Sequence, residues 1–490
     1  MSILQKLWHI NKYVPAKFVK SNLFSLKNNN TLKSCVITKR LIHNEQDDYD
    51  ENPNKIDIDA GYTEILTQFI NPSISGHKTL VIQPYIKWGK NKKTITSPDL
   101  QLNEAVALVK TLPKWTVTDS MCISMMTLKK DYIFGKGNLD MLTKKIRSNS
   151  KITAVFISMN LLRPIQIKDL QELFGVPVYD RYSIVIQIFR VHAKTTEAKL
   201  QVALAELPYI WTKLNWTAED SGGRINLSES RRMILHSRES KLKNSLKKLK
   251  EHRKLIRQHR KNLDIPSVAV VGYTNAGKTC LIKALTGDAS LTPENKLFAT
   301  LDTTAHEGIL PCKLKILYVD TIGFIQDIPE GLIEPFVATF EDAILSDVIV
   351  HVYDASHPDK HAQVIHVKET LTKIMSELLD EEKPVIEVAN KCDLIPAGTV
   401  SEDILTVSST QSHGIDLLRN EIQKKLLSVT GRQSVTIRVK SGSSIASWLY
   451  KETTVVNAEP DEKDLQYILM SVIATEHQMH KFRKFLKNNK

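Results

Sequence analysis

Residues 272–279 read Gly-Tyr-Thr-Asn-Ala-Gly-Lys-Thr and match the pattern G-x-x-x-x-G-K-[ST]. This loop follows an apolar run at 268–271 and precedes a stretch of helical spacing at 280–285. In a strand, loop and helix of this kind, backbone N–H groups point into one concavity. The helix N-terminus adds unpaired donors and the positive end of its dipole. The pattern therefore predicts a binding site for a polyphosphate.

A second signal is the segment 320–323, Asp-Thr-Ile-Gly, which comes directly after a predicted strand at 314–319. Asp320 would lie at the carboxyl end of that strand, where its carboxylate can hold Mg²⁺ through a water molecule. Gly323 has the backbone freedom that a close approach to a terminal phosphate requires. The two segments together predict a nucleoside triphosphate as the ligand.

The choice of base is encoded in the segment 390–393, Asn-Lys-Cys-Asp, after a predicted strand at 384–389. The Asp393 carboxylate can accept two hydrogen bonds from the edge of guanine, whereas adenine offers the wrong pattern, and Lys391 can lie along the base. The segment 407–409 can supply a backbone N–H to the guanine oxygen. Because a mismatched base would leave polar groups unpaired, the sequence favours GTP over ATP.

Two further positions bear on hydrolysis. A threonine in the segment 298–304 can place its hydroxyl on magnesium beside Thr279 and sense the terminal phosphate, and Thr300, Thr303 and Thr304 are all candidates from the residues alone. Phe324 follows Gly323 and cannot orient a water molecule with its side chain, so we expect slow intrinsic hydrolysis. The amide of Asn275 is equally compatible with a potassium ligand and with a group that only stabilises the loop.

The composition places these segments in an ordinary multidomain protein. The chain has 490 residues, 42% of them apolar and 25% charged, which predicts about three domains. No run of eighteen apolar residues exists, so the sequence predicts no membrane span. The five cysteines are scattered without a C-x-x-C pair, and we interpret them as reduced thiols.

Alternating helix and strand patterns before the phosphate loop predict an α/β domain at 77–200. Helices are expected at 100–112, 139–146 and 167–174, and a long helix starts near 195. Strands are expected at 79–84, 115–121, 153–159 and 182–189.

Residues 201–264 are predicted to form a basic helical hairpin. Between positions 231 and 261 there are thirteen Lys or Arg against two Glu, with Leu235, Leu242, Leu249 and Ile256 spaced seven residues apart. This pattern is compatible with a solvated helix that packs its apolar seam on a neighbour. The excess charge also favours contact with phosphates of nucleic acid or, as a rival, anionic lipid. The candidate RNA contacts are Arg231, Arg232, Lys247, Lys248, Lys250, Arg253 and Lys254.

The two ends of the chain differ in character. Residues 1–44 carry eight Lys or Arg and no acid, which is typical of a mitochondrial transit peptide, although a basic tail that binds nucleic acid is the alternative. Residues 45–76 are expected to be flexible. Residues 431–490 are expected to form a small α+β domain, with a strand at 435–439, a helix at 465–473 and a basic end at 481–490.

The order of segments GYTNAGKT, FATLD, DTIGFI and NKCD resembles the HflX-type ribosome-associated GTPases of the Obg–HflX group. The resemblance extends upstream to 134–138 and 196–204, and the basic leader is similar to that of mitochondrial members. It implies a P-loop GTPase domain at 265–430, with a mostly parallel sheet and helices on both faces. It also implies that the GTP-bound protein binds the large ribosomal subunit, splits ribosomes and assists large-subunit assembly in the mitochondrial matrix, and that hydrolysis to GDP releases it.

The resemblance also assigns roles to residues. Lys278, Thr300 and Gly323 would take part in catalysis, and Thr279, Thr300 and Asp320 would hold Mg²⁺, while K⁺ is a possible second ion. The expected nucleotide contacts are Gly272, Tyr273, Thr274, Asn275, Ala276, Gly277, Lys278, Thr279, Phe298, Ala299, Thr300, Leu301, Asp302, Asp320, Thr321, Ile322, Gly323, Asn390, Lys391, Cys392, Asp393, Val407, Ser408 and Ser409.

This chain departs from the family pattern in two places. The segment 221–227 lacks the glycine-proline-glycine-glutamate of bacterial members, and Asp302 is followed by Thr303 where the family has proline. Two rival functions stay open at this point: a GTPase of large-subunit assembly that does not split ribosomes, and a signalling GTPase directed to a membrane or a protein.

Overall fold

The structure is a computed structural model, and the residues it describes all belong to the second of two units, residues 60–490. They are residues 62, 76–88, 95–125, 133–219, 225–262, 264–326, 340–341, 343–378, 383–396, 398, 400–401, 403–462 and 464–488. The predicted transit peptide, almost all of the segment 45–76 and the start of the segment 221–227 lie outside the described residues. Among the described helices, none combines the length and apolar character that a membrane span requires.

The N-terminal domain is built on a four-stranded parallel sheet with the order β2-β1-β3-β4. Helices cross between its strands, and Leu80, Ile82, Val155 and Ile157 are fully buried beneath them. This arrangement confirms the α/β fold predicted for this part of the chain. The elements are β1 (Lys78–Ile86), α3 (Pro98–Thr111), β2 (Thr116–Met125), α4 (Lys136–Ser148), β3 (Ala154–Ile157), α5 (Pro164–Phe174) and β4 (Val178–Tyr179).

The strand predicted at 182–189 is wrong, because this segment forms the helix α6 (Arg181–His192). The Asp180 side chain accepts a hydrogen bond from the Ser183 N–H, and the Ser183 hydroxyl accepts one from the Asp180 N–H. This reciprocal capping starts a helix. The residues of 182–189 are buried, so the apolar run shows neither the period of two nor that of 3.6 residues.

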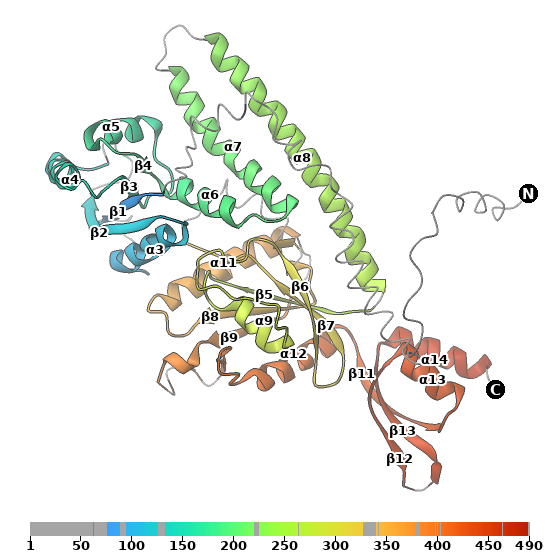
Figure 1. Cartoon of the computed structure of the whole chain (residues 1–490). Helices are drawn as coiled ribbons and strands as arrows, with labels where there is room; N and C mark the ends of the chain where they lie inside the picture. Colours follow the sequence, from blue (N-terminus) through green and yellow to red (C-terminus); the bar gives the residue numbers. More distant parts are fainter. Residues whose placement is uncertain are drawn as a thin grey trace, which may run out of the picture. The chain divides into compact units, whose positions relative to one another are not determined.

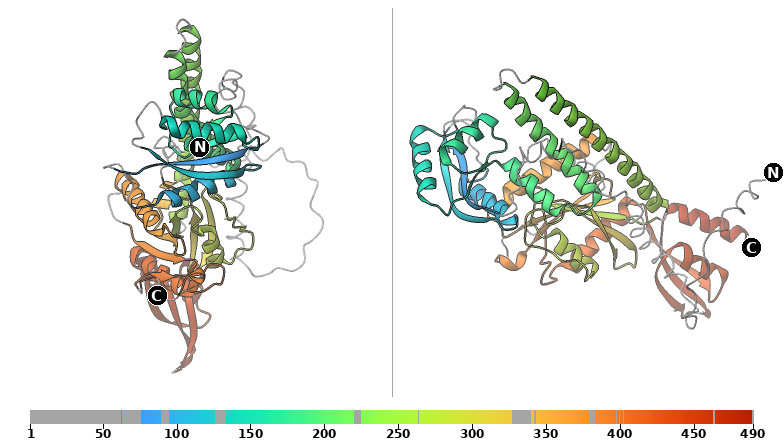
Figure 2. Two further views of the ribbon diagram at one scale, coloured as in Figure 1. Left: turned by 90° about the vertical axis from the view of Figure 1, so that its left-hand side faces the viewer. Right: turned by 45° about the horizontal axis from the view of Figure 1, so that its top comes forward.

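The helices α7 (Thr196–Glu219) and α8 (Ile225–Asn262) lie side by side (Figures 1 and 2). Leu235 and Leu242 of the predicted seam are fully buried, whereas Leu249 and Ile256 stay partly exposed. The pair of helices begins at Thr196, within the segment assigned to the N-terminal domain, and its apolar seam is buried only over part of α8.

The central domain has a six-stranded sheet with the order β10-β9-β8-β5-β7-β6, in which only β6 and β7 pair antiparallel. Its strands are β5 (Ser267–Gly272), β6 (Thr304–Ile309), β7 (Lys315–Asp320), β8 (Val348–Asp354), β9 (Val385–Asn390) and β10 (Leu405–Thr406). Its helices are α9 (Lys278–Thr286), α11 (Lys360–Leu378), η3 (Cys392–Leu394) and α12 (Ile415–Val429). Because β5, β7, β8 and β9 are parallel, the loops that follow them meet at one edge of the sheet.

The C-terminal domain is an antiparallel sheet of three strands with the order β11-β13-β12 and two helices (Figure 1). The helix predicted at 465–473 is wrong, because this segment is β13. The alternate residues Ile468, Met470 and Val472 enter the core, which is the period of a strand. The elements are β11 (Gln433–Lys440), α13 (Ser444–Glu452), β12 (Thr454–Asp461), β13 (Asp464–Ala474) and α14 (Glu476–Asn488).

Candidate nucleotide site

The predicted phosphate loop joins β5 to α9, as its sequence requires. Asn275 and Gly277 both have left-handed backbones, with φ of 62° and 90°. A Cβ atom on Gly277 would lie 2.3 Å from Nδ2 of Asn390, so the loop closes on that strand end only with glycine at this position. No side chain caps the N-terminus of α9, and its first N–H groups are therefore available to an anion.

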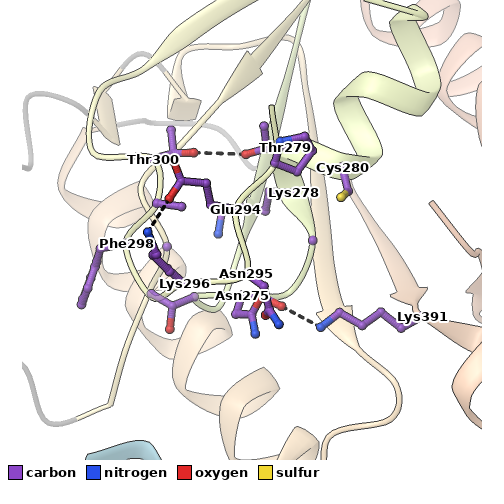
Figure 3. A pocket seen from close by; sticks show the side chains of 15 residues that line it. Asn275, Lys278, Thr279, Cys280, Glu294, Asn295, Lys296, Phe298, Thr300 and Lys391 are labelled. Carbon is purple, nitrogen blue, oxygen red and sulfur yellow. Dashed lines mark hydrogen bonds and ion pairs between the residues drawn. The ribbon is translucent and has the colours of Figure 1, made fainter. Parts of the chain in front are cut away.

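A cavity of about 300 Å³ opens in front of this loop (Figure 3). A volume of this size is typical of a small-molecule site. Its lining comes from four segments of the chain, which are the phosphate loop with the start of α9, the segment 293–300, Gly323 and Lys391. The sequence motifs did not mark Pro293, Glu294, Asn295 and Lys296, although all four line the cavity.

Lys278 lies at the base of the cavity. Its amine donates hydrogen bonds to the carbonyl oxygens of Tyr273 (3.0 Å) and Gly272 (3.3 Å). Burial lowers the pKa of Lys278 to about 8, against the opposing effect of the Asp320 carboxylate. A Cβ atom on Gly323 would lie 3.0 Å from Nζ of Lys278, so the backbone of Gly323 is next to the amine.

Three oxygen atoms converge beside Lys278. The Thr279 hydroxyl lies 3.1 Å from the Thr300 hydroxyl (Figure 3). It also lies 2.6 Å from Oδ2 of Asp320. The Thr300 hydroxyl lies 3.2 Å from the same Asp320 oxygen. Such a set of hydroxyl and carboxylate oxygens fits Mg²⁺. Thr303 and Thr304 do not line the cavity, so among the three candidate threonines only Thr300 reaches this point.

The segment after β9 is tied to the phosphate loop. The Asn390 amide donates to the carbonyl oxygen of Ala276 (2.9 Å), and its Oδ1 accepts from the N–H (3.2 Å) and hydroxyl (2.8 Å) of Ser409. The Lys391 amine donates to the carbonyl oxygen of Asn275 at 2.9 Å (Figure 3). The Asp393 side chain is exposed. The two segments predicted to hold a guanine base are thus joined to each other and to the phosphate loop.

Asp354, at the end of β8, is a site residue that the sequence motifs missed. Its Oδ2 accepts a hydrogen bond from the Lys391 amine at 2.7 Å, and it thereby orients this lysine. Although burial opposes it, hydrogen bonds from Lys391 and Ser356 leave the pKa of Asp354 below its usual value. Its position at the carboxyl end of a buried strand was the available signal.

Several of the predicted nucleotide contacts do not line the cavity and are buried or bonded to other parts of the protein. Leu301 is buried, and the Asp302 carboxylate accepts a hydrogen bond from the Thr195 hydroxyl (2.7 Å). The Thr321 hydroxyl donates to the carbonyl oxygen of Val270 (2.8 Å), and Ile322 is also buried. None of these four residues lines the cavity, and Asp320, Asn390 and Ser408 likewise lie behind its lining.

The Phe324 side chain is buried against Phe340, with ring centroids 4.8 Å apart. Its backbone pairs with the phosphate loop, since its N–H donates to the Gly272 oxygen (3.1 Å) and its oxygen accepts from the Thr274 N–H (2.7 Å). The ring therefore does not face the cavity and has no polar atom to offer a water molecule.

The predicted RNA contacts on α8 fall into two groups. Lys250 pairs with Glu341 at 2.6 Å, and Arg253 pairs with Glu197 of α7 at 2.5 Å. Arg231 is half-buried. Arg232, Lys247, Lys248 and Lys254 are exposed, and Lys250 is exposed as well although it pairs with Glu341.

Comparison with known proteins matches most of the chain. Family models described as "50S ribosome-binding GTPase", "GTP-binding GTPase N-terminal" and "GTP-binding GTPase Middle Region" match residues 267–391, 99–190 and 192–260. The chain is 40% identical over 424 residues to "Putative GTP-binding protein 6" of Xenopus laevis, which covers 83% of this chain and 79% of the relative. The human protein of the same name is 39% identical over 452 residues, with coverage of 89% and 86%. A "GTPase HflX" of Caldanaerobacter subterraneus is 34% identical over 352 residues, with coverage of 69% and 80%.

Proposed function

The chain belongs to the HflX family of GTPases, and on this premise we propose that it is a mitochondrial GTPase that binds the large ribosomal subunit in its GTP-bound state. In this proposal the bound protein splits ribosomes and assists assembly of the large subunit, and hydrolysis of GTP to GDP releases it. The observation that carries the proposal is the convergence of Thr279, Thr300 and Asp320 beside Lys278 and Gly323, because these groups come from segments that a terminal phosphate and Mg²⁺ would hold together.

Mg²⁺ would be held by the Thr279 and Thr300 hydroxyls, with Asp320 behind them. Bound there, it would neutralise charge on the phosphates. Thr300 reaches this point from the segment 293–300, which lines the cavity, so this contact would couple the shape of that segment to the bound nucleotide.

The side chain of Asn275 lines the cavity and is the residue that we propose for K⁺. A bound K⁺ would add positive charge beside the phosphates. Replacing K⁺ by Na⁺ in a hydrolysis assay should then lower the rate, and an equal rate in both salts would remove this role.

The family-model description "50S ribosome-binding GTPase" supports a ribosomal partner. The exposed basic residues of α8 support a partner rich in phosphate, because closely spaced like charges repel one another unless anions lie alongside. Anionic lipid would meet the same electrostatic requirement, and assembly without splitting would need the same contacts.

Sucrose-gradient sedimentation of mitochondrial ribosomes separates these functions. With the protein and a non-hydrolysable GTP analogue, we expect monosomes to give way to separate subunits, with the protein on the large one, and no such change with GDP. Intact monosomes would exclude splitting, and co-sedimentation with free large subunits would then favour the assembly function. Absence from every ribosomal fraction would favour the signalling function.

The contribution of α8 is tested by reversing the charge of Lys247, Lys248 and Lys254, which are exposed on this helix. We expect the triple Lys→Glu variant to lose co-sedimentation with the large subunit and to keep its affinity for GDP, because these residues lie outside the cavity lining. A control with the same charge change carries Lys→Glu at the exposed Lys424, Lys425 and Lys451. Equal ribosome binding by the two variants would exclude α8 as the contact.

A further inference from the structure

Tyr273 belongs to the phosphate loop, yet its hydroxyl makes its contacts away from the cavity. The hydroxyl donates a hydrogen bond to Oε2 of Glu104, in helix α3 of the N-terminal domain. It also accepts a hydrogen bond from the backbone N–H of Gln326 at 2.7 Å. One side chain of the loop therefore joins the N-terminal domain to the segment that follows Gly323.

Arg181, the first residue of α6, closes this arrangement from the other side. Its guanidinium forms an ion pair with Oε1 of Glu104 and donates a hydrogen bond to the carbonyl oxygen of Gln326 at 2.9 Å. The Glu104 carboxylate, the Tyr273 hydroxyl, the Gln326 backbone and the Arg181 guanidinium thus form a closed ring of hydrogen bonds. Both backbone polar groups of Gln326 are held by it.

The ring is shielded from water. Arg181 is 4% exposed, Tyr273 is 3% exposed and the Glu104 side chain is 18% exposed. Burial raises the pKa of Tyr273 well above its usual value, and the Glu104 carboxylate raises it further, so the hydroxyl stays protonated and can donate. Charge-assisted hydrogen bonds in such surroundings are stronger and more directional than neutral ones in water.

The ring acts on the segment where hydrolysis requires order. Phe324 is pinned to the phosphate loop through both of its backbone groups, and Gln326 is pinned two residues later through both of its own. The Phe324 side chain cannot orient a water molecule, so the backbone after Gly323 is a candidate for this role, and its position depends on these bonds. The ring is present in the same arrangement in which Thr300, Thr279 and Asp320 converge.

We propose that Glu104 and Arg181 of the N-terminal domain are positioning residues for GTP hydrolysis, which hold the segment after Gly323 through Tyr273 and Gln326. The N-terminal domain then completes the GTPase site, although none of its described residues lines the cavity. This role rests on the GTPase activity alone and is independent of any ribosomal partner.

The test compares steady-state hydrolysis by the full chain and by its Glu104→Gln and Arg181→Met variants, without ribosomes. We expect kcat to fall about tenfold in each variant, while KM for GTP and the Kd for GDP change by less than about twofold, because an interaction that orders the reacting groups is removed. The kcat of the double variant should be no lower than that of the more affected single variant, because both substitutions open the same ring of hydrogen bonds. Arg181→Lys, which keeps a donor and the charge, should recover part of kcat.

Glu172→Gln serves as the matched control, because Glu172 is exposed on α5 of the same domain. Far-UV circular dichroism and GDP binding confirm folding, and if Arg181→Met does not fold, Glu104→Gln carries the test. A kcat equal to that of the Glu172→Gln variant would overturn the proposal. So would a kcat above that of the wild type, which would mean that the ring restrains hydrolysis, or a rise in KM with kcat unchanged.

Discussion

At the scale of single residues, Lys278 shows how a phosphate site holds its charge. The amine is buried, and the protein offers it two carbonyl oxygens and the neighbouring Asp320 carboxylate. These oxygen atoms do not compensate for the hydration that the amine loses on burial. The pKa of Lys278 therefore falls to about 8 from the usual lysine value of about 10.4. Phosphate oxygens next to the amine would favour its charged form again, which links nucleotide binding to protonation.

We therefore expect GDP to bind about fourfold more weakly at pH 8.5 than at pH 7, because above pH 8 the unliganded amine loses the proton that the bound state needs. Titration calorimetry at several pH values measures this directly. It should also show proton uptake on binding near pH 8.5 and little uptake at pH 7. Equal affinities at the two pH values, with the fold verified by circular dichroism, would contradict the expectation.

We predict that Asp393 carries the choice of base. Its side chain is exposed at the start of η3, beside the wall formed by Asn390 and Lys391. In Asp393→Asn the carboxylate that would accept two hydrogen bonds from guanine is lost, and we expect the affinity for GDP to fall about 100-fold. Xanthosine diphosphate, which presents an acceptor in place of one donor, should gain affinity. The nearby exposed Asp403→Asn should change neither value, and retention of GDP binding by Asp393→Asn would contradict this role.

At the scale of elements, the parallel strands of the central sheet bring the loops together and also bury polar groups. His351 of β8 is 1% exposed, and neither of its ring nitrogens has a hydrogen-bond partner among the described residues. Burial lowers the pKa of His351 to about 4, against Glu387 of the adjacent strand, while Lys368 and Lys278 lower it further. The imidazole is therefore neutral near pH 7.

Because the folded-state pKa lies below the usual value of about 6.5, the unfolded state binds more protons between pH 6.5 and pH 4. The contribution of His351 to the free energy of unfolding is therefore fully present above about pH 6.5 and is lost as the pH falls below it. Between pH 7 and pH 5 the loss should be about 2 kcal/mol. His351→Leu should remove this part of the pH dependence and leave the domain as stable or more stable at pH 7, because it deletes an unsatisfied polar group.

Hydrogen exchange of the β8 amides at pH 7 and pH 5, corrected for intrinsic rates, measures this local free energy. His259→Leu, a change at an exposed position of α8, is the control and should keep the wild-type difference. If His351→Leu keeps the same difference between the two pH values, His351 does not titrate during unfolding.

At the scale of the whole molecule, contacts between distant parts of the chain surround the cavity. Phe189 of α6 packs edge-on against Phe298, with centroids 4.9 Å apart, and Thr195 bonds Asp302. With the Glu104 and Arg181 ring, the N-terminal half therefore contacts both the segment around Thr300 and the segment after Gly323. In this chain Thr303 stands where the family has a proline, which would stiffen the segment after Asp302. The hydrogen bond from the Thr195 hydroxyl holds the Asp302 carboxylate instead.

The basic leader at 1–44 remains a prediction, because it lies outside the described residues. Fused to a fluorescent protein, residues 1–44 should direct it to mitochondria, because positive charge and apolar residues combine in this segment. A control fusion with Lys6, Lys12, Lys17 and Lys20 changed to Glu should stay in the cytosol. Nuclear or diffuse fluorescence of the unaltered fusion would favour the basic tail that binds nucleic acid.

The sequence by itself determined the chemistry of the central site. Lys278, Thr279, Asp320, Gly323 and Asn390 could be placed because each follows a buried strand, and parallel strands end at one edge of their sheet. It also determined the family, since these segments keep a fixed order along the chain. Local patterns were sufficient wherever the physical constraint itself was local, as in a glycine-bounded loop before a helix.

The type of two elements and the long-range contacts of the site depend on the tertiary structure. Residues 182–189 and 465–473 were assigned the wrong element because burial on all sides hides the period of a helix, and because apolar residues three to four apart also occur in a strand. Thr300, which the family resemblance favoured over its neighbours, meets Asp320, and Asp354, Glu104 and Arg181 join the site, by contacts across 20 to 169 positions of sequence. No local pattern encodes such contacts, because they form only when separate elements pack and their polar groups must find partners away from water.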